Sequence, residues 1–135
     1  MRAVRLYPWL ITLLLTGCAP VPVSPSVADV DPLRRAVVED VVLGMSDVFT
    51  PSATVLAPMR APAGAFDSAL LAALRAKGYT VSPVGGRGAA FDCVVDSIGG
   101  GLYRLKVRVG TSTMSRLWMN ASGGVSTGGA WTRRE

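Results

Sequence analysis

Apolar residues recur at helical spacing over residues 32–48, which predicts an amphipathic helix. Its apolar stripe consists of Leu33, Val37, Val41, Met45 and Val48. Asp31 suits the N-cap, and Pro32 suits the first helical position, where an N–H would have no partner within the helix. A second helix is predicted over residues 65–77, which are rich in Ala and Leu and stop at Gly78. The buried face of this helix consists of Phe66, Leu70, Ala73 and Leu74.

Two short apolar segments flank the second helix and predict a β-α-β unit. Residues 54–56 form a strand candidate between Pro51 and Pro58. These prolines are compatible with a strand at the edge of the sheet, because proline has no N–H to donate to a second neighbouring strand. Residues 79–81 follow the helix at once as the second strand candidate. Because a right-handed crossover connects such strands, we expect them to be parallel neighbours.

Three longer strands are predicted over residues 91–98, 102–109 and 114–121, with glycine-rich joints between them that are typical of an antiparallel meander. In the middle strand, apolar and basic residues alternate strictly. The residues that point to one face are Tyr103, Leu105, Val107 and Val109, and those that point to the other are Arg104, Lys106 and Arg108. This alternation predicts a sheet with one solvent-facing side and one side covered by helices.

Together these elements predict a single α+β domain over residues 31–122, with two helices packed on one face of a small, mostly antiparallel sheet. A chain of 135 residues leaves no room for a second domain. Because half of the residues are hydrophobic and only 17% are charged, we expect a folded core. Residues 123–135 read as a glycine-rich tail that is partly ordered at best.

The amino-terminal residues 1–17 have the composition of a signal peptide. Arg2 and Arg5 precede an apolar run of ten residues, 6–15, that Pro8 interrupts. A membrane-spanning helix needs about 20 apolar residues, so this run is too short for a permanent span.

The residues that follow, Leu15-Thr16-Gly17-Cys18, resemble the lipobox of bacterial lipoproteins. The resemblance implies cleavage between Gly17 and Cys18, lipid on the Cys18 thiol, and a membrane location facing the periplasm. Ala19 in the next position points to the outer membrane. The alternative is a cysteine that follows an ordinary signal peptide by coincidence. In residues 18–30, Pro20, Pro22 and Pro25 favour an extended tether of about 30 Å.

Charge and composition exclude several function classes. The formal net charge is +5, and removal of the two signal-peptide arginines lowers it to about +3. This excess is too small for sequence-independent nucleic-acid binding, so we do not expect nucleic acid as a partner. The chain has no histidine, and histidine is the commonest general base and a common metal ligand. We therefore expect no catalytic residues, no metal site and no cofactor.

Three candidate chemical groups have simpler structural interpretations. Cys93 has no cysteine partner once Cys18 is lipidated, and a buried core position is favoured over an intermolecular disulfide or a nucleophile. Asp92 and Asp96 share a sheet face at ~13 Å, too far apart for a paired-carboxylate site, and suit ion pairs with Arg104 or Arg108. The loop over residues 85–88, Gly-Gly-Arg-Gly, reads as a turn, since it lacks the Lys-Ser/Thr ending of a phosphate-binding loop.

A basic stripe is the candidate docking face. It consists of Arg104, Lys106, Arg108 and Arg116, with Trp118 assigned to the same face by its parity. A solvated sheet face, a protein-docking face and a surface for single-stranded nucleic acid are the three interpretations of this stripe.

Several segments of the mature chain resemble the TrbH family of small lipoproteins, which belong to the mating-pair-formation proteins of P-type conjugative plasmids and related type IV secretion systems. The resemblance covers residues 40–131. Together with the lipobox at residues 15–18, it lies in the helix at residues 66–74 that runs into Gly78-Tyr79-Thr80-Val81, in Leu102-Tyr103-Arg104-Leu105 and in Ser115-Arg116-Leu117-Trp118. It implies a non-enzymatic envelope component that supports a transfer channel, with other channel proteins as partners.

The sequence therefore predicts a lipid-anchored assembly or scaffolding component of a conjugative transfer apparatus at the outer membrane. The alternative is a stand-alone periplasmic lipoprotein that binds a small ligand or the cell wall. An enzyme is the third possibility, for which no nucleophile, base and orienting group occur together.

Overall fold

The computed structural model describes residues 32–122 and 124–135, so the predicted signal peptide, Cys18, the tether and the Asp31 N-cap lie outside the described residues. Helix α1 spans Pro32–Val48 and helix α2 spans Ala65–Lys77, as the sequence predicts. Gly78 ends α2 in the left-handed conformation at φ 111°. The N–H of Tyr79 then donates to the carbonyl of Leu74 at 3.1 Å, which satisfies one of the free carbonyls in the last turn.

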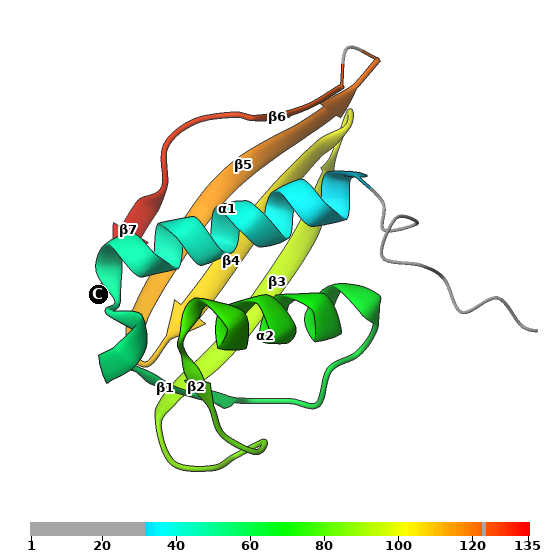
Figure 1. The fold of residues 1–135 in the computed structure, drawn as a ribbon. Coiled ribbons are helices and arrows are strands. Elements are labelled where there is room, and N and C mark those ends of the chain that lie inside the picture. The colour runs from blue at the N-terminus through cyan, green and yellow to red at the C-terminus, as the bar shows by residue number, and fades with distance from the viewer. Residues whose placement is uncertain (1–31, 123) are drawn as a thin grey trace, which may run out of the picture.

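The described residues form a seven-stranded sheet in the order β2-β1-β3-β4-β5-β6, with β7 also paired to β5 (Figure 1). The strands are β1 (Val55–Pro58), β2 (Thr80–Val81), β3 (Ala89–Gly99), β4 (Leu102–Val109), β5 (Ser112–Ala121), β6 (Gly124–Thr127) and β7 (Thr132–Arg134). The pairings of β1 with β2 and of β1 with β3 are parallel, and all the others are antiparallel. The predicted α+β class with a mostly antiparallel sheet is confirmed.

The flanking prolines Pro51 and Pro58 were compatible with an edge position for β1, but β1 is an inner strand. β1 lies between β2 and β3, and β2 is the edge strand instead. β1 can pair with a strand on each side because it is only four residues long. Pro51 lies before it, and Pro58 is its last residue. The predicted parallel pairing of the two strands that flank α2 is confirmed.

The description of residues 123–135 as a partly ordered tail is wrong for its strands. β6 and β7 both pair with β5, on the edge that β4 leaves free. Between them the Gly128 N–H donates to the Leu117 carbonyl at 2.8 Å. The hydrophobic pattern missed these strands because they are short, polar and mostly exposed, and their hydrogen bonds to β5 hold them in place.

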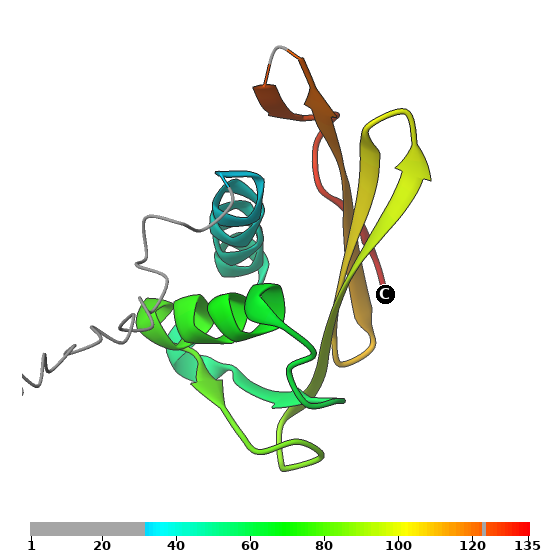
Figure 2. The ribbon, with the colours of Figure 1, turned by 90° about the vertical axis from the view of Figure 1, so that its right-hand side faces the viewer.

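One hydrophobic core joins side chains of both helices with side chains of β1, β3, β4 and β5. Its fully buried large residues are Val41, Met45, Leu56, Leu70, Leu74, Leu105, Val107 and Met114. Figure 2 shows both helices on the same side of the sheet, with the far end of the β3–β4 hairpin extending beyond them. No helix of the described residues is long and apolar enough to cross a membrane.

Candidate functional site

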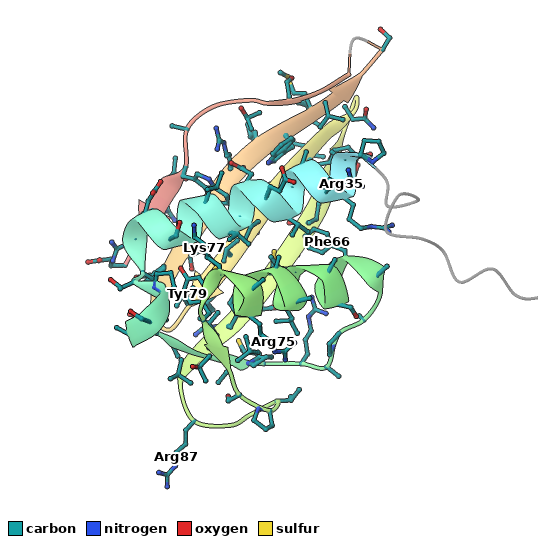
Figure 3. The ribbon with its side chains drawn as sticks, in the orientation of Figure 1. Arg35, Phe66, Arg75, Lys77, Tyr79 and Arg87 are labelled. Atoms are coloured by element: carbon teal, nitrogen blue, oxygen red, sulfur yellow. The ribbon has the colours of Figure 1, made fainter. Side chains whose placement is uncertain are left out.

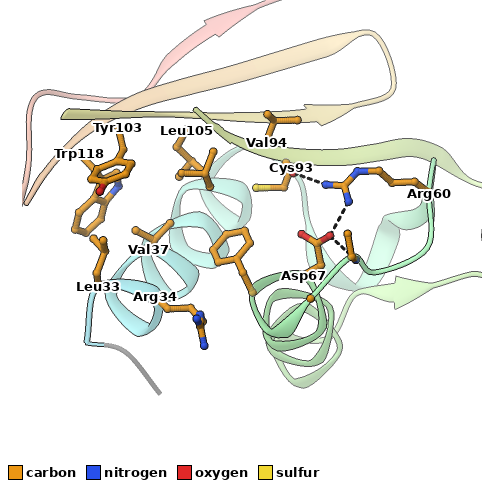
Figure 4. A pocket seen from close by; sticks show the side chains of 14 residues that line it. Leu33, Arg34, Val37, Arg60, Asp67, Cys93, Val94, Tyr103, Leu105 and Trp118 are labelled. Carbon is orange, nitrogen blue, oxygen red and sulfur yellow. Dashed lines mark hydrogen bonds and ion pairs between the residues drawn. The ribbon is translucent and has the colours of Figure 1, made fainter. Parts of the chain in front are cut away.

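A groove opens between the first turns of α1 and α2, on the helix-facing side of β3, β4 and β5 (Figure 4). Its volume is about 460 Å³, within the range of ligand-sized pockets. Apolar side chains supply most of its lining, chiefly Leu33, Val37, Phe66, Val95, Leu105 and Trp118. We refer to this feature as the interhelical groove. The predictions from sequence did not include it, because its walls come from five separate elements.

Arg60 closes one end of the interhelical groove. Its Nη1 lies 2.7 Å from Asp67 Oδ2, and its Nε lies 3.1 Å from Asp92 Oδ1. Its Nη2 donates to the carbonyl of Cys93 at 3.0 Å. The hydrogen bond with Asp67 raises the pKa of Arg60, and the charge of Asp92 acts in the same direction. One guanidinium therefore ties the β1–α2 loop to α2 and to β3 (Figure 4).

Asp67 has a second role beside its ion pair. Its Oδ2 accepts a hydrogen bond from the N–H of Ala63 at 2.9 Å, just before α2 begins. A carboxylate in the first turn of a helix also interacts favourably with the positive end of the helix dipole. Asp67 therefore fixes both the entry of the chain into α2 and the orientation of Arg60.

Cys93 lines the interhelical groove as a buried free thiol, as the core interpretation expected. Burial, together with the negative charges of Asp67 and Asp92, raises its pKa from 9.0 to about 12. At neutral pH the thiol is protonated, and the thiolate that would act as a nucleophile is scarce. Cys93 is therefore a packing residue in this fold.

A polar contact between β5 and α1 lies next to Trp118, which lines the groove. Arg116 Nη1 lies 2.5 Å from Asp40 Oδ1, with side chains that are 20% and 15% exposed. The Trp118 indole N–H donates to Asp40 Oδ2 at 3.2 Å, and Arg116 Nε donates to the Gly129 carbonyl at 2.7 Å. Asp40 thus receives two donors from β5, and Arg116 also fixes the loop that leads to β7.

The predicted basic stripe is wrong for two of its members, because Arg116 and Trp118 do not share a face with Arg104. Residues directly opposite in an antiparallel pair point to the same face of the sheet. Arg116 is opposite Leu105, and Trp118 is opposite Tyr103, so both face the helices. Leu117 takes the position opposite Arg104.

The remaining basic residues alternate along β4 with the buried Leu105, Val107 and Val109, so they lie on the opposite face of the sheet. Figure 2 shows that the helices leave this face open. Arg104 and Lys106 both approach Asp96 Oδ2, at 3.1 and 3.6 Å, so the predicted ion pair across the strands is confirmed for Asp96. Arg108 donates to the Gly110 carbonyl, and Asp92, although opposite Arg108, binds Arg60.

Apolar side chains surround these basic residues on the same face. They are Val94, Leu117 and Met119, each 38% or 39% exposed. We refer to these three residues together with Arg104, Lys106 and Arg108 as the outer sheet face. Arginine and methionine are enriched in protein interfaces, and such a mixed apolar and basic surface suits protein contact.

The glycine-rich loop at residues 85–88 and the acidic residues do not form a binding site among the described residues. The loop at residues 85–88 leads into β3 and not into a helix, and Figure 3 shows Arg87 pointing away from the molecule. Gly88, at φ 135°, leaves no room for a side chain, since a Cβ there would lie 2.6 Å from the Val55 carbonyl oxygen. Within the described part of the chain, no three Cys, Asp or Glu residues are grouped as metal ligands would be.

The comparison with known proteins identifies a family. The family model of the conjugal transfer protein TrbH matches residues 21–135. No curated protein and no solved structure matches the chain. Since the match extends over nearly all of the chain, including both helices and every strand of the sheet, the chain belongs to the conjugal transfer protein TrbH family.

Proposed function

We propose that this protein is a lipid-anchored, non-enzymatic component of a conjugative transfer apparatus that contacts other transfer proteins through its outer sheet face. Family membership supports a role in conjugal transfer and association with the cell envelope. The observation that carries the docking role is the outer sheet face itself. It combines Arg104, Lys106 and Arg108 with three exposed apolar side chains, and neither helix covers it.

A scaffolding role fits the groups that the described residues present. The only cysteine among them is buried with a raised pKa, and the carboxylates of Asp40, Asp67, Asp92 and Asp96 are held in ion pairs. A nucleophile with a base within hydrogen-bond reach, which covalent catalysis requires, does not occur among these groups.

Co-purification with other transfer proteins tests the docking role. The double variant R104E/R108E reverses the charge of the outer sheet face at exposed positions, so we expect it to fold and to lose the transfer partners. The matched control R75E/R87E makes the same charge change at two exposed arginines on α2 and on the loop before β3. Equal recovery of partners with both double variants would contradict the docking role.

The proposed anchor rests on the lipobox at Leu15-Thr16-Gly17-Cys18, outside the described residues. Two or three acyl chains on one residue bind a membrane durably, whereas a single chain binds reversibly. We expect labelled palmitate to enter the wild-type protein and not Cys18→Ala, and we expect the labelled protein in the outer-membrane fraction. Equal labelling of both proteins would refute the anchor without affecting the docking role.

A further inference from the structure

The edge of β3 that faces β1 is covered over only half of its length. β1 pairs with Ala89, Ala90 and Phe91, and the last backbone bond on this edge runs from Met59 N–H to the Phe91 carbonyl. The Arg60 side chain then binds the Cys93 carbonyl. Beyond Cys93, none of the described residues pairs with this edge.

The open part of the edge presents backbone groups in a regular pattern. Both N–H and C=O of alternate residues in a strand point to the same edge. Because the carbonyls of Phe91 and Cys93 point toward the β1 side, those of Val95 and Ser97 point there too. These two residues therefore offer the donors and acceptors for one more strand, as an exposed edge usually does.

The same part of β3 forms a wall of the interhelical groove. Val95 belongs to the helix-facing set of β3 with Phe91 and Cys93, yet it is 42% exposed, because α2 does not extend over it. An added strand opposite Val95 would place alternate side chains directly into the groove. The edge and the groove thus form one receptor for an extended segment with apolar residues at alternate positions.

We propose that residues 20–23, Pro-Val-Pro-Val, add to the open edge of β3 as an antiparallel strand and place Val21 and Val23 in the interhelical groove. These residues precede the described part of the chain, which begins at Pro32. The next residues, Leu33 and Arg34, line the groove, so the chain enters the fold beside the receptor. Residues 24–31 can span up to ~26 Å, enough to reverse direction and reach the edge.

The alternation of proline with valine suits this position for a backbone reason. Proline has no N–H to donate, so a strand with proline at every second residue can pair along one edge alone. With Val21 and Val23 bonded to β3, Pro20 and Pro22 face outward and end the sheet. Antiparallel pairing is required, since it alone puts residues that bond with Val95 on the same face as Val95.

Docking of this segment changes the reach of the tether, a consequence that rests on the anchor proposed at Cys18. With residues 20–23 bound, Ala19 alone separates the lipidated cysteine from the folded domain. The domain would then be held against the membrane, and release of the segment would restore the full span of the extended tether. The contact therefore sets the distance between the membrane and the outer sheet face.

Amide hydrogen exchange of the full-length chain in detergent tests the contact at single residues. In the wild type we expect the amides of Val95 and Ser97 to be protected. In V21D/V23D we expect them to exchange roughly tenfold faster or more, while amides of the core strands keep their wild-type protection. The control S24D/S26D adds the same charge to the same segment, at positions outside the proposed strand, and leaves Val95 and Ser97 protected.

Two results would overturn the proposal. Unprotected Val95 and Ser97 amides in the wild type would show an open edge. Equal protection in all three proteins would show a different occupant, and dependence of that protection on protein concentration would identify it as a second copy of the chain. Because no substitution lies in the folded domain or on the outer sheet face, these results leave the docking and anchoring tests unaffected.

Discussion

Gly44 of α1 lies directly beneath the indole ring of Trp131, so close that a Cβ on Gly44 would be 2.5 Å from Trp131 Nε1. The carboxyl-terminal segment therefore packs against the first helix, and the guanidinium of Arg116 lies 5.9 Å from the centre of the same ring. A glycine in the middle of a helix costs stability, and here the cost makes room for a rigid aromatic side chain.

Gly44→Ala is expected to lower the free energy of unfolding by about 1–3 kcal/mol, because the added methyl overpacks against the indole ring. In a Trp131→Ala background the clash is absent. The same substitution should then raise stability by up to about 1 kcal/mol, since alanine is the better helix former.

Urea denaturation of the four proteins in this double-mutant cycle measures the coupling. If Gly44→Ala has the same sign in both backgrounds, the packing of Trp131 on α1 is not the reason for the glycine.

Asp40→Ala leaves the Arg116 guanidinium and the Trp118 N–H without their acceptor on α1. Because both partners are largely buried, we expect a loss of about 2–4 kcal/mol in the free energy of unfolding. The control is Asp96→Ala, which removes the acceptor of Arg104 and Lys106 on the exposed face and should cost less than about 1 kcal/mol. Chemical denaturation compares the two variants, and equal losses would contradict a structural role for the Asp40 contact.

The prediction placed Arg116 and Trp118 on the wrong face of the sheet. This error shows which properties of a sheet the local sequence pattern can predict. Alternation along β4 correctly separated Leu105 and Val107 from Arg104, because that separation depends on one strand only. The face of β5 relative to β4 depends on the register across the turn. Val109 is opposite Ser112, so even-numbered residues of β4 are opposite odd-numbered residues of β5.

Arg60 shows what sequence reasoning missed at the site. It stands alone in an irregular segment, with no periodicity and no charged residue beside it. Its partners Asp92 and Cys93 are 32 and 33 residues away. Only the parallel pairing of β1 with β3 brings the two segments together. In contrast, the bounds of both helices followed from local periodicity and from Gly78.

Arg60→Lys is expected to destabilise the fold almost as much as Arg60→Ala, by about 1–2 kcal/mol. A single ammonium group cannot reach Asp67, Asp92 and the Cys93 carbonyl from the three directions that the guanidinium serves. Thermal unfolding of both variants measures the effect. The control Arg75→Lys changes an exposed arginine on α2 and should have little effect. Wild-type stability of Arg60→Lys would show that charge alone suffices at this position.

The thiol of Cys93 is expected to react slowly with iodoacetamide at pH 8 in the folded protein and readily in urea. The raised pKa of about 12 leaves almost no thiolate at that pH, and burial restricts access to it. The rate is followed by mass spectrometry in a Cys18→Ala background, so that only Cys93 is labelled. Equal rates in the folded and unfolded protein would contradict the burial of this residue.

The raised pKa of Cys93 also predicts a loss of stability in alkali. Between pH 9 and about 12 the unfolded chain releases the thiol proton while the folded chain retains it, so the unfolded state is favoured as the pH rises. Below pH 9 the thiol is protonated in both states and the contribution is complete. Since Tyr79 and other groups also titrate at high pH, the measurement is the difference in urea stability between wild type and Cys93→Ala across this range. Wild-type stability should fall more steeply with pH, and parallel curves would show that Cys93 does not titrate differently in the two states.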